Sequence, residues 1–378
     1  MADDESSLFS CGRCCELVLE VALEPPRALF KFWSSLSCFT IPPRCVAIEP
    51  RNAFYDRNRD GSPFVWLLED TYQGEDFLKN VNFFSGHHDP TRYVAREEAY
   101  QNRLAYVADN GNVILKADDT NQLPFGENRT SVRVNTVKDY SGGLFILDLD
   151  RAPWGCGIWP AWWSTAVGTG WPALGEIDII EGVHDNQHNE MAWHTAEGCL
   201  LDTEEDFTGN VSIKHNGPAT NCWAHLPGSN NVGCSITESS RSFFGPYFES
   251  QGGGVFAMKW DENGIAIWSF YRAAIPQDIT NGTPNPSSWY KPSALLGPKK
   301  CDIEKYFRNH TIILNITFCG DWAGNTYEAA GCPGSCRERL MNPANFVNAT
   351  WSIRSLKVYR KQLIHAEIHG GAVSALAG

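Results

Sequence analysis

Short apolar runs separated by polar loops dominate the chain from about Phe64 onwards. Most are rich in β-branched residues, and the loops between them are rich in Gly, Pro, Asn and Ser, a pattern typical of strands. The runs are Gly111–Ala117, Ser131–Val137, Leu144–Leu147, Gly254–Trp260, Gly264–Tyr271, Thr311–Phe318 and Trp351–Tyr359. Asn263-Gly264 marks a hairpin turn. A helical period is not sustained for three turns, except for a possible short helix near Asp302–Phe307, so the pattern predicts an all-β sandwich or barrel.

Three segments differ in composition along the chain. Residues 1–64 combine clustered cysteines with Pro25-Pro26, and we expect them to form a poorly ordered extension. Residues 65–361 hold the predicted strands and form the main domain. Residues 362–378 drift into small side chains and form a tail.

The net charge narrows the class of partner. At −13 over 378 residues, the chain would repel nucleic acids and anionic membranes, whereas a neutral sugar polymer is compatible with it. No apolar run is long enough to span a membrane. Fourteen tryptophans is a high count; most are expected to pack in the core and some to line a sugar-binding groove. We expect a monomer.

Cysteines and glycosylation sequons indicate an oxidising compartment. Eight cysteines lie between Cys156 and Cys336, and we expect most of them to be paired, with no pairing preferred from sequence. Six Asn-x-Ser/Thr sequons begin at Asn128, Asn210, Asn281, Asn309, Asn315 and Asn348. These features favour a secreted or cell-wall protein. A signal peptide is not expected in this chain, because its start is acidic and Glu20 interrupts the first apolar stretch.

The most informative segment is Gly175–Gly182, Gly-Glu-Ile-Asp-Ile-Ile-Glu-Gly. On a regular strand Glu176 and Asp178 share one face, while Ile177 and Ile179 point to the other. Strict alternation would place Ile180 on the acidic face, so one inserted residue, a β-bulge, is needed to bring Glu181 there. Three acids on one strand are costly, and this favours a catalytic role over a solvated surface strand.

Paired carboxylates are suited to glycoside hydrolysis. One glutamate attacks the anomeric carbon and the other donates a proton to the leaving oxygen, which in a retaining enzyme requires carboxyl groups ~5–5.5 Å apart. Asp178 between them would help to separate their protonation states, because neighbouring carboxylates cannot all ionise cheaply.

The acidic segment resembles the Glu-x-Asp-x-x-Glu signature of glycoside hydrolase family 16, in its fungal endo-1,3(4)-β-glucanase (laminarinase-like) branch. The flanking segments extend the likeness over about residues 70–360: Phe83–Gly86, Asp89–Thr91, Gly155–Trp163, Met191–Thr195 and Phe318–Gly324. The resemblance implies a concanavalin A-like β-sandwich jelly roll with a concave substrate groove. It also implies retention, with Glu176 as nucleophile, Asp178 as its assisting acid and Glu181 as general acid/base.

Further groove candidates come from the same likeness. Trp159 and Trp163 lie four residues apart on an expected strand and share a face, and Trp171 lies five residues before Glu176. Each has a core alternative. His194 is expected on the strand that pairs with the acidic one, and Trp322 is a weaker candidate. The set His184, His188 and Glu190 reads as a loop rather than a metal site, so we expect no metal and no cofactor.

Three functions remain open on sequence. The first is hydrolysis of β-1,3 or mixed β-1,3/1,4-glucan by internal cuts. The second is cell-wall transglycosylation, although such enzymes in the family tend to carry the shorter Glu-x-Asp-x-Glu. The third is a non-catalytic glucan-binding module, which the presence of all three acids disfavours.

Overall fold

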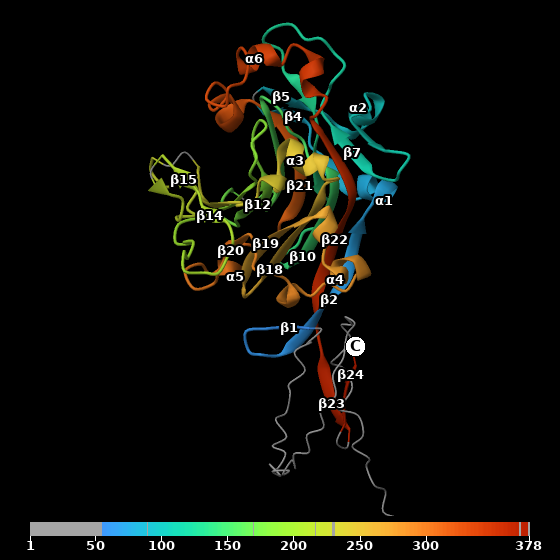
Figure 1. Ribbon diagram of the computed structural model, residues 1–378, viewed down its shortest axis with the longest axis vertical. Helices are drawn as coiled ribbons and strands as arrows, with labels where there is room; N and C mark the ends of the chain where they lie inside the picture. Colours follow the sequence, from blue (N-terminus) through green and yellow to red (C-terminus); the bar gives the residue numbers. More distant parts are fainter. Residues whose placement is uncertain are drawn as a thin grey trace, which may run out of the picture. The chain divides into compact units, whose positions relative to one another are not determined.

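The structure, a computed structural model, describes residues 55–88, 90–168, 170–215, 217–228, 231–369 and 372–376, with side chains as far as residue 364. These residues belong to one compact unit that begins at Asn52. Two large antiparallel sheets, A and B, make up most of it (Figure 1).

Sheet A has nine strands. Its main path runs in the order β1 (Asp56–Arg57), β2 (Pro63–Tyr72), β22 (Thr350–Leu363), β10 (Gly143–Arg151), β18 (Gly254–Asp261), β19 (Gly264–Tyr271) and β20 (Ala294–Leu296), and β6 (Ala105–Val107) joins through β7 (Val113–Lys116), which pairs with β22. The expected hairpin is β18–β19, with Asp261 paired to Gly264.

Sheet B has eight strands and carries the acidic segment near its centre. The strand order is β14 (Asn210–Val211), β17 (Cys234–Thr237), β13 (Glu190–His194), β12 (Glu176–Glu181), β11 (Ile158–Thr165), β21 (Thr311–Phe318), β9 (Arg133–Thr136) and β3 (Val81–Phe83). The expected strands at residues 111–117, 131–137, 144–147, 254–260, 264–271, 311–318 and 351–359 are therefore confirmed, with shifts of a few residues at their ends.

Small sheets and short helices connect the strands. The small sheets are β4 (Gly86–His88) with β5 (Thr91–Tyr93) and β8 (Arg129–Ser131), β15 (Ile213–Lys214) with β16 (Gly217–Pro218), and β23 (His365–His369) with β24 (Ala372–Leu376). The α-helices are α1 (Gly74–Lys79), α2 (Arg96–Gln101), α3 (Gly245–Ser250), α4 (Gln277–Asn281), α5 (Ile303–Tyr306, the expected short helix) and α6 (Cys336–Arg339). Single turns are η1 (Arg241–Phe243), η2 (Arg272–Ala274), η3 (Pro286–Ser288), the π-turn η4 (Gly320–Gly324) and η5 (Pro343–Phe346). Among the described residues no helix has the length and apolar character of a membrane span.

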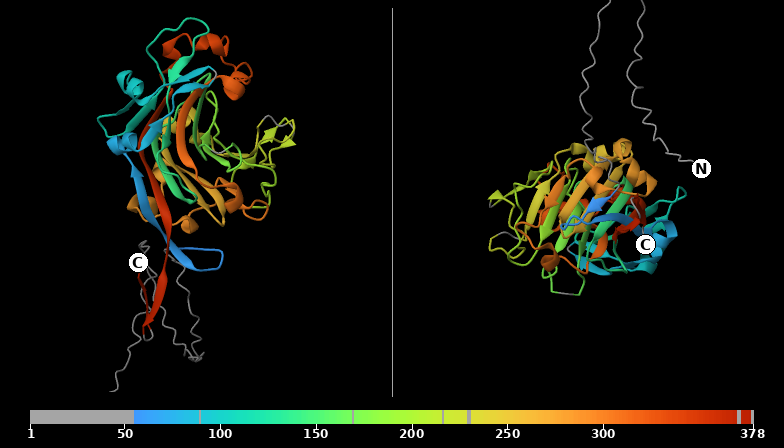
Figure 2. Two further views of the ribbon diagram at one scale, coloured as in Figure 1. Left: turned by 180° about the vertical axis from the view of Figure 1, so that it is seen from behind. Right: turned by 90° about the horizontal axis from the view of Figure 1, so that it is seen from below.

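The two curved sheets pack face to face and enclose the main core (Figure 2). Leu147 and Phe256 of sheet A meet Trp162 and Ile177 of sheet B in one cluster, all with 0% exposure. Burial of each such side chain stabilises the fold by about 1.5–3 kcal/mol. This arrangement confirms the β-sandwich jelly roll expected from sequence.

The outer faces of the two sheets differ. A second apolar cluster covers the outer face of sheet A, where Trp289 packs edge-on against Trp268 and Phe270 with ring centroids 5.2 Å away in each case. The outer face of sheet B instead presents carboxylates, tryptophans and an arginine. That face of sheet B is therefore the one available to a ligand.

Sheet A begins before the domain boundary that we set at residue 65. Strand β1 pairs Asp56 with Phe64, and the buried carboxylate of Asp56 accepts a hydrogen bond from Trp66 Nε1 at 2.7 Å. At the other end β22 continues to Leu363, beyond the boundary at residue 361. The rest of the expected extension, residues 1–54, lies outside the described residues.

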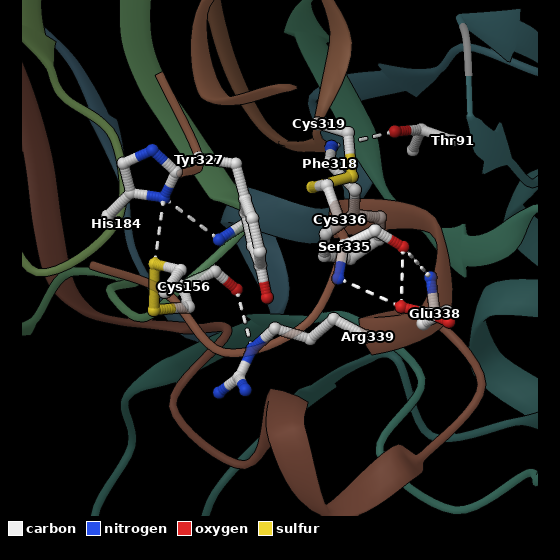
Figure 3. Close-up of a disulfide and its surroundings, with 12 residues drawn as sticks. Thr91, Cys156, His184, Phe318, Cys319, Tyr327, Ser335, Cys336, Glu338 and Arg339 are labelled. Atoms are coloured by element: carbon white, nitrogen blue, oxygen red, sulfur yellow. Dashed lines mark hydrogen bonds between the residues drawn. A yellow bond between two sulfur atoms is a disulfide. The ribbon is translucent and has the colours of Figure 1, made fainter. Parts of the chain in front are cut away.

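All eight cysteines from Cys156 to Cys336 are paired, as expected. The disulfides join Cys156 to Cys332, Cys199 to Cys301, Cys222 to Cys234 and Cys319 to Cys336. Two of them, shown in Figure 3, flank the paired strand ends Ile158 of β11 and Phe318 of β21. They tie residues 319–336 to the end of sheet B, and this segment carries Trp322.

Candidate active site

A β-bulge in β12 gathers the three acids. Relative to β11, Trp162 pairs with Ile180 and Trp163 with Asp178, so Ile179 is the extra residue. The register also shifts between Asp178 and Glu181 relative to β13. The isoleucines of the strand are fully buried, and all three carboxylates line one cleft. The predicted bulge is confirmed.

The cleft lies on the outer face of sheet B and draws on strands that are distant in sequence. Trp159 and Trp163 line it together, as expected from their spacing on β11. Its full lining is His88, Tyr93, Arg133, Trp159, Ala161, Trp163, Glu176, Asp178, Glu181, Asn315 and Thr317.

Each glutamate is held by a tryptophan. Trp159 Nε1 donates to Glu181 Oε1 at 2.8 Å, and Trp171 Nε1 donates to Glu176 Oε2 at 3.0 Å. Trp171 lies on the loop between β11 and β12 and is 38% exposed, so it is not a core residue. Each donor stabilises the ionised form of the carboxylate that it contacts.

Trp322 lies beside the cleft rather than in its lining. Its ring meets Trp159 edge-on with centroids 5.9 Å apart, and Lys214 Nζ lies 5.2 Å from its ring centroid. It lines an adjoining cavity with His188 and Glu190. The structure therefore places Trp322 next to the acids through Trp159.

His194 lies on β13 directly opposite Glu176, on the strand expected to pair with β12. Its Nε2 is 3.3 Å from Asp178 Oδ2 and 3.9 Å from Glu176 Oε1. Gly233, with φ +62°, makes room for this imidazole, because a Cβ there would come within 2.7 Å of His194 Nδ1. The histidine thus contacts two of the three acids.

Burial and mutual repulsion separate the protonation states of the acids. Burial, with the charge of Asp178, raises the pKa of Glu176 to about 7. Burial also raises the pKa of Asp178, with a contribution from Glu190. The pKa of Glu181 is raised well above its usual range, first by burial and then by Asp178. Glu181 therefore keeps its proton at a pH where Glu176 can already be ionised.

Several cleft residues could not be identified from sequence. The half-buried Arg133 has its guanidinium carbon 4.8 Å from the Trp163 ring centroid, and burial lowers the pKa of Arg133. Asn315 Oδ1 accepts from Trp163 Nε1 at 2.6 Å, and its Nδ2 donates to Thr317 Oγ1 at 2.9 Å. These residues come from β21, which pairs with β11, and from β9, which pairs with the far side of β21, an arrangement set by the order of strands in sheet B.

Asn315 corrects one inference from sequence. We counted it among the glycosylation sequons, but it lies on the central strand β21 with 7% exposure, and both ends of its amide are hydrogen-bonded. A buried side-chain amide in the cleft cannot carry a glycan without losing those contacts. The sequon at Asn315 therefore occurs by chance in a site residue.

Among the described residues, two of the acids and their histidine partner are suited to hold a cation. Glu176, Asp178 and His194 each offer an atom within 4.8 Å of the others. His184, which we weighed as a ligand with His188 and Glu190, has both ring nitrogens engaged, with Gly157 N at 3.0 Å and Thr326 Oγ1 at 3.0 Å. It is a buried structural residue.

Residues 82–359 match a family described as the XgeA-like, catalytic GH16 domain. The chain belongs to this family. The expected membership of glycoside hydrolase family 16 is thereby confirmed, and the three acids, Trp159, Trp163, Trp171, His194 and Trp322 all lie within the matched residues.

Curated relatives from fungi agree with the family match. A probable glycosidase of Schizosaccharomyces pombe is 40% identical over 316 residues, covering 82% of this chain and 73% of that protein. An endo-1,3(4)-β-glucanase of Arthroderma benhamiae is 40% identical over 313 residues, covering 79% of this chain and 65% of that protein. An Aspergillus flavus relative, a probable endo-1,3(4)-β-glucanase, is 37% identical over 322 residues, and the chain spans 46% of the length of that protein.

Solved structures of family 16 members share the fold. Laminarinase 16A from Phanerochaete chrysosporium, with β-glucans in donor and acceptor sites, is 36% identical with a TM-score of 0.73, covering 78% of this chain and 100% of that one. An elongating β-1,3-glucosyltransferase of the same family is 34% identical with a TM-score of 0.70 and the same coverage.

Proposed function

We propose that this family 16 protein is a retaining endo-glycosidase that cleaves β-1,3 or mixed β-1,3/1,4-glucan through a covalent glycosyl-enzyme. The observation that carries the proposal is the arrangement on β12, where Glu176, Asp178 and Glu181 line one cleft and each glutamate accepts a hydrogen bond from a different tryptophan. The fungal relatives named as endo-1,3(4)-β-glucanases support the choice of substrate.

In this proposal Glu176 is the nucleophile, because its pKa of about 7 is the lowest of the three acids and it therefore ionises first. Its carboxylate attacks the anomeric carbon while Glu181 gives its proton to the leaving oxygen. Glu181 then takes a proton from the water that cleaves the intermediate. Asp178, in contact with His194, assists by keeping the protons of its two neighbours apart.

The aromatic side chains would bind the glucan. Trp159 and Trp163 offer ring surfaces inside the cleft, and Trp171 and Trp322 extend the aromatic surface at its margins. His194 would position the nucleophile through its contacts with Asp178 and Glu176. The protein would act as a monomer, secreted or in the cell wall, with the residues before β1 as an extension and those after β22 as a tail.

One assay tests this proposal. Release of reducing ends from laminarin, barley β-glucan and cellulose should be seen with the first two substrates, and should be lost in Glu176→Gln. A variant that keeps the activity, or an enzyme active only on cellulose, would contradict the proposal.

Transglycosylation is the second candidate, favoured by the likeness to the elongating β-1,3-glucosyltransferase. It would use the same glycosyl-enzyme and differ only in the acceptor. Products longer than the substrate, formed from laminari-oligosaccharides at high concentration, would identify it.

A further inference from the structure

At the bulge that brings Glu181 into the cleft, two backbone groups of β12 are hydrogen-bonded by a side chain. Between the pairs Asp178–Ala192 and Glu181–Glu190, β12 has two residues where β13 has one. The two groups are the carbonyl of Ile179 and the N–H of Glu181. Both lie next to a fully buried core, where an unpaired backbone group is costly.

One side chain satisfies both groups. Glu181 N donates to Asn189 Oδ1 at 2.9 Å, and Asn189 Nδ2 donates to the Ile179 carbonyl at 2.8 Å. An amide suits this place because it offers one acceptor and one donor, as the missing stretch of strand would have done. Asn189 is 0% exposed, so water does not replace it.

Asn189 is itself fixed. It directly precedes β13, and its own carbonyl accepts a hydrogen bond from Glu238 N at 2.8 Å. Its amide therefore approaches the bulge from an anchored backbone. Without it, the alternative for β12 is an unbulged register, and a shift of one residue moves a side chain to the opposite face of the sheet.

We propose that Asn189 is a positioning residue that holds the bulge and thereby aims the carboxyl group of Glu181 at the scissile oxygen. The inference rests on the proposed function, in which Glu181 is the general acid/base. It makes a specific prediction: loss of Asn189 impairs the proton donor while the nucleophile Glu176, on the unbulged part of β12, stays competent.

The test compares two reactions in Asn189→Ala. Hydrolysis of laminarin needs the proton from Glu181. Labelling by dinitrophenyl 2-deoxy-2-fluoro-β-laminaribioside does not, because the Glu176 carboxylate displaces a dinitrophenolate that leaves without a proton. General acid catalysis contributes about 10²–10⁴-fold. We therefore expect laminarin hydrolysis to fall by about 100-fold or more, and the rate of labelling at Glu176, followed by mass spectrometry, to change less than about fivefold.

Two further variants separate positioning from general destabilisation. Asn112→Ala removes another buried asparagine amide, which donates hydrogen bonds to Asp150 Oδ2 and Ser352 Oγ on two strands of sheet A. It should leave the ratio of the two rates unchanged. Asn189→Asp can reproduce both hydrogen bonds only when its carboxyl group is protonated, so it should recover hydrolysis relative to Asn189→Ala at low pH and lose that gain as pH rises.

The outcomes are distinguishable. A wild-type enzyme that is not labelled at Glu176 would overturn the proposed function and this inference with it. Normal labelling of the wild type together with an equal fall of both rates in Asn189→Ala would overturn the inference alone, as would laminarin hydrolysis that is unaffected by Asn189→Ala.

Discussion

Replacing Glu176 with glutamine should stabilise the folded protein at alkaline pH and not at acidic pH. The reason is the raised pKa of this carboxyl group, from an ordinary value of 4.5 to about 7. The folded chain then holds the proton more tightly than the unfolded chain, so the stabilising contribution is complete below pH 4.5 and is lost as pH rises through about 7. At about 1.4 kcal/mol per pKa unit, this shift lowers the free energy of unfolding of the wild type by about 3 kcal/mol at pH 8.

Glutamine removes this dependence because it has the shape of the protonated acid and still offers an oxygen to Trp171 Nε1. Free energies of unfolding from urea titrations should therefore differ by about 3 kcal/mol between Glu176→Gln and wild type at about pH 8, and by little at about pH 4. Glu127→Gln, at an exposed loop position, is the matched control and should change neither value. A variant that is no more stable than wild type at pH 8, or is equally stabilised at both pH values, would refute the argument that burial raises this pKa.

Three other predictions concern the cleft and its surroundings. Trp171→Phe removes the hydrogen-bond donor to Glu176 Oε2, and this hydrogen bond helps to lower the pKa of that carboxyl group. The acidic limb of the pH–activity profile should therefore move to higher pH, and an unmoved limb would count against this role. Peptide mapping of unreduced protein should yield Cys156–Cys332, Cys199–Cys301, Cys222–Cys234 and Cys319–Cys336, and free thiols among these eight cysteines would contradict the fold. Glycopeptide mapping of protein secreted from a eukaryotic host should find Asn315 bare even where exposed sequons such as Asn210 or Asn281 are occupied, and a glycan at Asn315 would refute its place in the cleft.

The bulge in the acidic strand was predictable because catalytic acids must share one face, whereas strict alternation would separate them. Glu181 is out of phase with Glu176 and Asp178 on a regular strand, and only an inserted residue resolves the conflict, as Ile179 does. The paired face of Trp159 and Trp163 followed from the same period of two.

What sequence could not provide depends on contacts between distant segments. Arg133 and Asn315 reach the cleft because β21 lies beside β11 and β9 lies beside β21, an order that no local pattern encodes. Asn189 lies in a polar stretch that reads as loop, and its role is visible only once its amide is seen to join two backbone groups of another strand. The sequon at Asn315 misled for the same reason, because burial is a property of the fold.

The roles of the two glutamates are tested most directly by the configuration of the azide products. With an activated aryl β-glycoside and added azide, Glu181→Ala should give the β-glycosyl azide. Azide attacks the intermediate formed on Glu176 from the β-face, where the truncated side chain at position 181 leaves space. Glu176→Ala should give the α-azide, because no covalent intermediate intervenes. Azides of the same configuration from both variants, or an α-azide from Asp178→Asn in place of Glu176→Ala, would contradict the assignment of Glu176 as the nucleophile.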